Sequence, residues 1–407
     1  MEWKEVRLGN VCEIYGRIGF RGYTTNDLVD TPKEGAISLS PKNIINCELN
    51  LEQCTYIKWD KYYESPEIMI NPNEIVITKT GSSLGRTTFV RRVVHPMTLN
   101  PQLVVLKNIS ENAEFLSYYI KSALFQSVLK SIVVGSAIPT LSQKNLANIM
   151  INVPKEVEDQ RRIASILSSL DRKIELNNKI NADLEEMAQA IFKNWFVDFE
   201  PFKDGKFVDS ELGMIPKGWK VGTLTEIASY MNGLAMQKFP PENNEDSLPV
   251  LKIKELGQGF CGTDSDRCSC NIKDECKIHN GDVIFSWSGT LLVDVWCGGD
   301  CGLNQHLFKV TSKDYPKWFY YYWTKHHLQE FIHIAKDKAV TMGHIKRGHL
   351  EEAMVAIPDN DSMEKAHELF EPILSKMISL RLENSRLSLL RDTLLPRLMS
   401  GKLEVPQ

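Results

Sequence analysis

The chain has 407 residues, of which 43% are hydrophobic and 25% charged, and its formal net charge is −4. This length predicts two or three domains, each able to bury its own core. The sequence has no apolar stretch of membrane-spanning length and no secretory signal at its start, so we expect a cytoplasmic protein whose nine cysteines stay reduced. The negative charge argues against indiscriminate binding to polyanions, although it leaves room for local basic surfaces and protein partners.

The two halves of the chain carry the same short patterns in the same order. A Trp-Lys pair opens each half, a buried-strand pattern leads into a glycine turn, and a Leu-Asn pair and a strand-ending proline follow. The matched segments are Trp3-Lys4 and Trp219-Lys220, residues 75–78 and 283–286, Leu99-Asn100 and Leu303-Asn304, and Pro154 and Pro358. The last two pairs share an offset of 204 residues, which predicts an internal duplication.

Each half ends in a long helical pattern, at about 159–195 in the first half and after Phe370 in the second. Apolar residues recur at alternating spacings of four and three, which is typical of a coiled-coil seam. We expect the two helices to pair antiparallel; packing of each helix only on its own globule is the alternative. The residues expected at the pairing seam are Leu170, Ile174, Asn181, Leu184, Ile373, Met377, Asn384 and Leu387.

Two asparagines interrupt the apolar seam near the middle of these helices. Asn181 and Asn384 occupy equivalent heptad positions, where a buried amide lowers stability but fixes register and orientation. We therefore expect them to meet across the antiparallel pair. Pro396 is expected to end or kink the second helix.

These patterns predict a mixed α/β protein with two similar globular domains separated by two long helices that form an antiparallel coiled coil. The expected parts are a first domain at 1–154, a helix at 155–200, a linker at 201–217, a second domain at 218–358 and a C-terminal helix at 359–407. Related globules on a rigid helical spacer suit contact with two separated DNA segments, although a protein scaffold satisfies the same geometry.

Motifs for catalysis are missing from the sequence. No G-x-x-x-x-G-K-[ST] phosphate loop occurs, and the G-x-G-x-x-G pattern of Gly257, Gly259 and Gly262 continues into turn residues instead of a helix. Residues 71–73 (NPN) and 239–242 (FPPE) both fail the pattern of an amino-methyltransferase. We therefore expect no catalytic residues in this chain and no cofactor bound by it.

A group of cysteines in the second half could ligate zinc. The group comprises Cys261, Cys268, Cys270 and Cys276, with Cys297 and Cys301 beyond. No C-x-x-C pair occurs among them, so their spacing favours reduced thiols in a loop. Metal binding by the first four stays open from the sequence.

The best basic stretch lies between Lys79 and Lys107, which contains no Asp or Glu. A Gly-Ser loop within it, a second loop at 135–144, and the matching loops of the second half are candidates for contacts to phosphates and bases. The candidates are Lys79, Thr80, Ser82, Ser83, Arg86, Arg91, Arg92, Ser136, Thr140 and Lys144, followed by Trp287, Ser288, Thr290, His344, Lys346 and Arg347. Solvated polar loops without a ligand are the alternative.

Three segments also resemble a known family. Residues 158–164 (EDQRRIA), with Leu170-Asp171 and Ile174 after them, are similar to the central conserved region of type I restriction-modification specificity subunits. Residues 211–219 (ELGMIPKGW) and 395–403 (LPRLMSGKL) look like that family's entry to a second recognition domain and its C-terminal ending.

This resemblance implies two target recognition domains that read a bipartite site in double-stranded DNA. It also implies conserved helices that dock two methyltransferase subunits, with nuclease-translocase subunits joining that core and no association with a membrane. S-adenosylmethionine, ATP and magnesium would belong to those partners, and adenine would be the modified base. A non-catalytic structural adaptor, whose coiled coil and duplicated globules bind proteins, is the alternative function.

Overall fold

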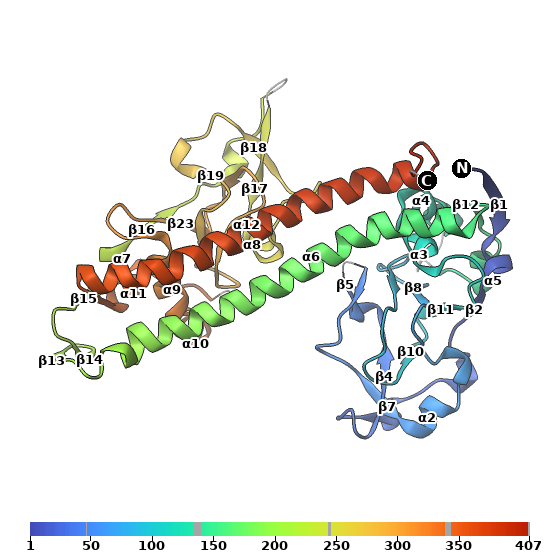
Figure 1. Ribbon diagram of the computed structural model, residues 1–407, viewed down its shortest axis with the longest axis horizontal. Helices are drawn as coiled ribbons and strands as arrows, with labels where there is room; N and C mark the ends of the chain where they lie inside the picture. Colours follow the sequence, from blue (N-terminus) through green and yellow to red (C-terminus); the bar gives the residue numbers. More distant parts are fainter. Residues whose placement is uncertain (46, 134–139, 243–245, 338–342, 406–407) are drawn as a thin grey trace. The chain divides into compact units, whose positions relative to one another are not determined.

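The computed structural model describes residues 1–405 except 46, 134–139, 243–245 and 338–342. It divides into two compact units, the first formed by Met1–Arg172 with Leu387–Gln407 and the second by Lys173–Arg386. Each unit is described by itself (Figure 1). Within the described residues, no helix is both long and apolar enough to cross a membrane.

The first unit is built on two four-stranded sheets and an opening strand pair. In the pair, β1 (Trp3–Arg7) runs antiparallel to β12 (Met150–Pro154). One sheet has the antiparallel order β2 (Glu13–Tyr15), β11 (Leu103–Lys107), β8 (Ile75–Thr78) and β9 (Thr87–Phe89). The other has the order β10 (Met97–Leu99), β4 (Gly35–Leu39), β7 (Tyr56–Lys58) and β3 (Leu28–Val29), with β10 parallel to β4. A small ladder joins β5 (Ile44–Ile45) to β6 (Glu48–Leu49).

Five shorter helices complete the first unit. They are α1 (Leu8–Val11), α2 (Trp59–Tyr63), α3 (Ala113–Lys121), α4 (Ala123–Ile132) and α5 (Gln143–Ala147). Strand β8 is buried on both faces, because Ile75 and Ile77 join a core with the helices while Val76 joins a core with the second sheet. Alternation of side chains along a strand explains why its sequence is an unbroken apolar run.

The second unit repeats this plan. Strand β15 (Lys220–Thr223) pairs with β24 (Met354–Ile357), and one sheet has the order β16 (Ser229–Asn232), β23 (Leu307–Thr311), β20 (Val283–Ser286) and β21 (Leu292–Val295). The other has the order β18 (Arg267–Ser269), β17 (Ser247–Leu251), β22 (Cys301–Leu303) and β19 (Lys277–Ile278), with β17 parallel to β22. The helices are α7 (Leu224–Ile227), α8 (Ile253–Gln258), α9 (Lys317–His326), α10 (Leu328–Asp337) and α11 (Arg347–Glu352).

The strand orders confirm the internal duplication. The sheet β2-β11-β8-β9 corresponds strand by strand to β16-β23-β20-β21, and β10-β4-β7 corresponds to β22-β17-β18 with the same directions. Only the fourth strand of the second sheet differs, since β3 adds beside β7 whereas β19 adds beside β22.

Residues 201–217, expected as a linker, contain a hairpin of β13 (Phe207–Ser210) and β14 (Gly213–Pro216). Gly213 has a φ of +83°, in the left-handed region where glycine carries no steric penalty, which closes this tight turn. The segment expected as a linker therefore contains a two-stranded hairpin of its own.

The long helices are α6 (Val157–Phe192) and α12 (Asn360–Met399). In the second unit, Asn177 Nδ2 on α6 donates to Asn384 Oδ1 on α12 over 2.8 Å, and the Phe192 and Phe370 rings lie 6.2 Å apart. Because contacts on α12 move backward as α6 advances, the helices run antiparallel there (Figure 1). Phe192 and Phe370 also join the core of this unit, so the helices pack on each other and on the globule.

The asparagine register differs from the expected one. Asn384 accepts from Asn177 and donates to Asn178 over 2.8 Å, while Asn181 is buried and its Oδ1 has no partner among the described residues. The repeat that aligns Asn181 with Asn384 aligns Asn177 with Leu380. The pseudo-twofold axis of the helix pair therefore lies between Asn177 and Asn181, and neither asparagine meets its own counterpart.

The residues expected at the pairing seam are all at least partly buried. Asn181 and Met377 are buried, and the half-buried members are Leu170, Ile174, Leu184, Ile373, Asn384 and Leu387. In contrast to the expectation for Pro396, α12 continues to Met399. The proline lies in the last turn, where it removes only one helical hydrogen bond, and Gly401 follows with a φ of +70°.

In the first unit, an ion pair links the same two helices. Asp171 on α6 accepts from Arg391 Nη1 on α12 over 2.8 Å and from the Tyr118 hydroxyl on α3 over 2.6 Å. Burial and the neighbouring Asp171 carboxylate raise the pKa of Tyr118, so the hydroxyl remains a donor at neutral pH. One carboxylate thus joins three helices.

Replacing Phe370 with Ala tests the packing of α12 on the second unit. The ring is fully buried and stacks on Trp318 at 4.7 Å, so we expect the free energy of unfolding to fall by about 3–5 kcal/mol. Leu369→Ala is the control, because this neighbouring side chain is already 42% exposed and should cost clearly less. Urea unfolding of both variants measures the difference, and equal losses would contradict this packing.

Candidate nucleic-acid interface

The two loops predicted in the first half lie side by side at the end of β8. Thr80, just beyond the strand, forms an isolated antiparallel bridge with Thr140, and Leu141 N donates to Lys79 O over 2.8 Å. Because β8 is buried, this bridge holds the loop before α5 against a rigid strand end. The two loops were predicted as separate candidates, and the fold brings them together.

A third segment, the turn between β10 and β11, joins the same place. Lys79 N donates to Gln102 O over 2.8 Å, and Asn100 Nδ2 donates to Gln102 Oε1 over 3.2 Å. We call residues 79–86, 100–102 and 140–144 the first corner. From the sequence, the Leu-Asn pair served only as a marker of the repeat. The pair recurs where a buried strand ends, and this recurrence was the signal that could have identified the turn.

The second half forms a matching arrangement. Ser288 bridges His344, Ile345 N donates to Trp287 O over 3.1 Å, and Gly289 N donates to Gly343 O over 2.9 Å. The Trp287 ring lies 5.9 Å from the His306 ring, which belongs to the turn after β22. We call residues 287–290, 304–306 and 343–347 the second corner.

Glycines shape the loops after β8 and β20. Gly81 and Gly85 have φ values of +88° and +83°, and Gly289 has a φ of +67°. A side chain with a Cβ would be strained in these turns, so the glycines permit the strand to reverse within a few residues.

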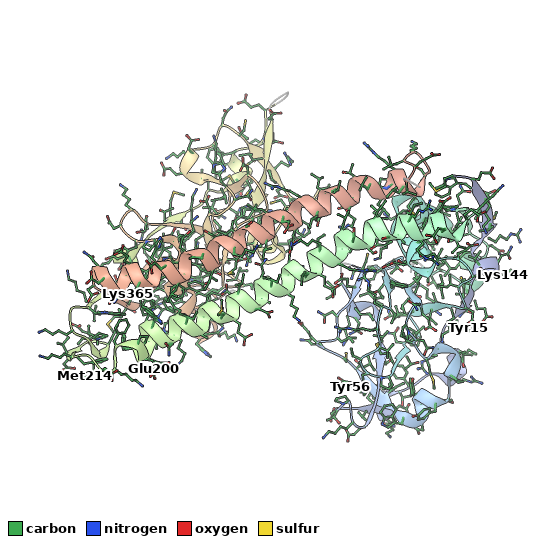
Figure 2. All side chains as sticks on the ribbon, viewed as in Figure 1. Tyr15, Tyr56, Lys144, Glu200, Met214 and Lys365 are labelled. Atoms are coloured by element: carbon green, nitrogen blue, oxygen red, sulfur yellow. The ribbon has the colours of Figure 1, made fainter. Side chains whose placement is uncertain are left out.

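Most corner candidates present their side chains to solvent. The exposed ones are Ser82, Arg86, Thr140, Lys144, Thr290, His344, Lys346 and Arg347, and the half-buried ones are Lys79, Thr80, Ser83 and Trp287. Lys144 is exposed on α5 at the surface of the first unit (Figure 2). Burial lowers the pKa of Lys79. Ser288 is only 6% exposed, and its backbone forms the bridge to His344.

The fold disperses the basic stretch that the sequence suggested. Arg91 lies 3.9 Å from Glu114 of α3, and Lys107 pairs with Glu74 at 3.1 Å. These carboxylates come from other parts of the chain, so a count of local charge could not anticipate them. Arg91 is therefore not one of the corner cations, which are Lys79, Arg86 and Lys144. Arg92 is exposed beyond the end of β9, and Ser136 lies outside the described residues.

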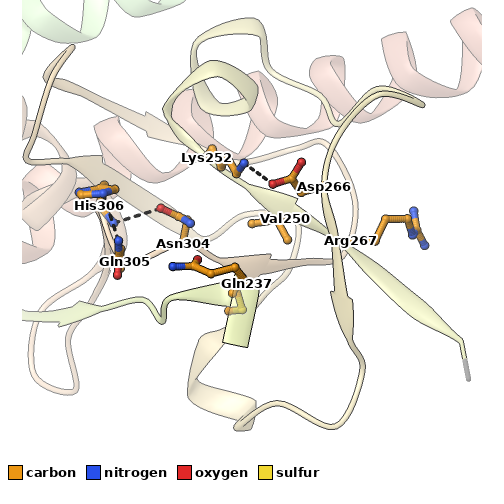
Figure 3. A pocket seen from close by; sticks show the side chains of 9 residues that line it. Gln237, Val250, Lys252, Asp266, Arg267, Asn304, Gln305 and His306 are labelled. Atoms are coloured by element: carbon orange, nitrogen blue, oxygen red, sulfur yellow. Dashed lines mark hydrogen bonds and ion pairs between the residues drawn. The ribbon is translucent and has the colours of Figure 1, made fainter. Parts of the chain in front are cut away.

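A cavity of about 460 Å³ adjoins the second corner (Figure 3). It lies between the turn Met236–Lys238, strands β17 and β18, and the turn 304–306. Its polar lining comes from Gln237, Lys252, Asp266, Arg267, Asn304, Gln305 and His306. The Lys252 ammonium pairs with the Asp266 carboxylate, which leaves amides and an imidazole as the main hydrogen-bonding groups.

The candidate metal-binding cysteines do not converge. Among the residues that the structure describes, no group of three or more His, Cys, Asp or Glu side chains could hold a metal ion. Cys268 and Cys276 are buried, Cys261 and Cys270 are half-buried, and all nine cysteines are free thiols. A hydrogen bond with Cys301 lowers the pKa of Cys261.

Comparison with known proteins gives consistent matches. Residues 1–186 and 216–384 match the family model described as type I restriction modification DNA specificity domain. The type I restriction enzyme MjaIX specificity subunit of Methanocaldococcus jannaschii is 28% identical, covering 100% of this chain and 94% of that relative. The HindI specificity subunit of Haemophilus influenzae is 21% identical, covering 99% and 100%.

A solved structure has the same fold. The type I restriction-modification S subunit from M. genitalium superimposes with a TM-score of 0.55 at 15% sequence identity, covering 98% of this chain and 96% of that one. At this identity the similarity supports the fold alone.

Limited alkylation tests the thiol environments. At pH 8, iodoacetamide should modify Cys261 ahead of Cys297, because the thiolate reacts and burial raises the pKa of Cys297 to about 11. Peptide mass spectrometry of the native protein measures both rates. Cys301→Ala removes the hydrogen bond and should slow the alkylation of Cys261. Faster alkylation of Cys297 than of Cys261 would contradict the lowered pKa of Cys261.

Proposed function

The chain belongs to the family of type I restriction-modification DNA specificity domains, and from this premise we propose that each corner contacts one half of a bipartite double-stranded DNA target. The family model matches the chain twice, so DNA sequence recognition is divided between two domains. The observation that carries the proposal is the duplicated bridge, Thr80 with Thr140 and Ser288 with His344. In both halves it joins two loops at the end of a buried strand, and a third loop contacts the first of them.

The chemistry of the corners supports this role. Arg86 and Lys144 in the first corner, and Lys346 and Arg347 in the second, are exposed cations suited to phosphate oxygens. Amide and hydroxyl side chains beside them suit base edges in a groove. Cations position the duplex and polar side chains read it, which is the division of labour that sequence recognition requires.

Partner proteins supply the reaction in this proposal. Two methyltransferase subunits dock on α6 and α12 and carry S-adenosylmethionine, while nuclease-translocase subunits carry ATP and magnesium; this chain provides recognition in the cytoplasm. Exposed apolar side chains on the helices support docking, with Leu176 and Met187 on α6 and Leu389 and Leu390 on α12. A purely structural adaptor does not account for membership of a DNA specificity family.

Exchange of one domain tests the bipartite assignment. Replacing residues 1–154 with the equivalent domain of a relative should change one half of the recognised target, because each corner is built within its own unit. Methylated adenines are mapped by single-molecule sequencing of DNA from cells that also express the partner subunits. Exchange of 218–358 is the reciprocal control, and a swap that altered both halves would refute independent reading.

The salt dependence of DNA binding distinguishes the corner cations from cations that face a carboxylate of the chain. Arg86→Ala should reduce the slope of log binding constant against log salt by about 0.9, the contribution of one phosphate contact. Arg91→Ala is the matched control and should leave the slope nearly unchanged, because Arg91 faces Glu114. Filter binding or anisotropy at several salt concentrations measures both. A larger effect from Arg91 would place the phosphate path along α3 instead.

A further inference from the structure

The cavity at the second corner has the form and chemistry of a base-reading subsite. We propose that Gln237 and Asn304 read the edge of one base pair in the second half of the target, an inference that rests on the proposed function. The two amides reach the same space from different elements, Gln237 from the turn Met236–Lys238 and Asn304 from the end of β22 (Figure 3).

The Gln237 amide is available for a ligand. Gln237 is exposed, and within the described residues its side chain makes no hydrogen bond, so both its donor and its acceptor are open. Asn304 Oδ1 accepts from His306 N over 3.4 Å, and among the described residues its Nδ2 makes no hydrogen bond. Amides that both donate and accept match a base edge with a donor beside an acceptor, as adenine presents in the major groove.

The charge of the cavity favours a base edge over a phosphate or a metal ion. Its carboxylate, Asp266, is paired with Lys252, and the Arg267 guanidinium donates to Ser247. The cations at the cavity are thus engaged, whereas a phosphate site would need them free. No metal-binding group of side chains occurs among the described residues.

Backbone hydrogen bonds fix the position of the turn that carries Asn304 in the absence of a ligand. Asn304 N donates to Leu251 O over 3.1 Å, Leu307 N donates to Asn304 O over 3.0 Å, and Leu234 bridges the same residue. Because Asn304 is fixed by backbone hydrogen bonds, it loses little conformational entropy on binding, so its geometry can discriminate between bases.

Two buried nitrogens connect the cavity with the loop after β20. Trp287 Nε1 and His306 Nδ1 have no hydrogen-bond partner in the described part of the chain, and their rings lie 5.9 Å apart. Buried polar groups without partners are uncommon and cost free energy. His306 lines the cavity and Trp287 belongs to the second corner, so the contact between their rings joins the cavity to the corner.

The corresponding turn of the first corner is arranged differently. There Asn100 Nδ2 donates to Gln102 Oε1 over 3.2 Å, so the donor of one amide is bound by the acceptor of the other. The two halves of the chain therefore read with different groups, and the two halves of the target need not carry the same sequence.

The test replaces Gln237 with Ala in the complete complex with its methyltransferase subunits. We expect one base pair of one half-site to lose its preference by roughly tenfold or more, while the other half-site keeps its sequence. Gln237→Glu keeps the acceptor and removes the donor, so it should shift the preferred base at that position. Gln329→Ala is the matched control, since this exposed amide lies on α10 of the same unit.

Methylation maps and thermal melting distinguish the outcomes. An unchanged motif in a folded Gln237→Ala complex, or an equal loss of binding across all sequences, would overturn the reading role. If Gln237→Ala lowers the melting temperature of the complex, Gln237→Glu becomes the deciding variant. An unchanged motif in the Gln237→Glu complex would also overturn the reading role. A wild-type complex that methylates no bipartite motif would instead refute the proposed function.

Discussion

The backbone bridge between a buried strand end and the loop before a short helix is the constraint on which both corners depend. Strands β8 and β20 are fully buried, so Thr80 and Ser288 leave the core at fixed positions. Their bridges to Thr140 and His344 then fix loops that would otherwise be free. Because backbone hydrogen bonds form these contacts, the side chains of the loops can vary while their placement persists. A recognition domain needs this separation of scaffold from reading residues.

The long helices pack on a globular core through some residues and on each other through others. Near the end of α6, Phe192 belongs to the core of the second unit, while Asn177 on the same helix meets Asn384 of α12. The buried amides reduce stability relative to apolar residues, and in exchange they penalise other registers. In the first unit Asp171 has a related role, since its carboxylate accepts from Arg391 and Tyr118. Polar contacts thus specify how the helices align, and apolar contacts supply most of their stability.

Electrostatic pairing decides which cations can act on a ligand. Arg91 and Lys107 belong to the most basic stretch of the sequence, yet Glu114 and Glu74 face them in the fold. Arg86 remains exposed at the first corner. In the cavity beside the second corner, the carboxylate of Asp266 is likewise paired with Lys252, so amides dominate the cavity. The proposed recognition surface is therefore a mixture of a few cations and many neutral polar groups, which agrees with a chain of net charge −4.

Much of the architecture could be predicted from the sequence by itself. Constant offsets revealed the duplication, and heptad spacing revealed the two long helices, because periodicity is a local property that survives in any tertiary context. Only the tertiary structure decided that Thr80 lies against Thr140, that Asn384 meets Asn177 instead of Asn181, and that Gln237 and Asn304 share a cavity. These contacts join residues far apart in the chain, and their identity depends on the registers of strands and helices, which no local pattern encodes.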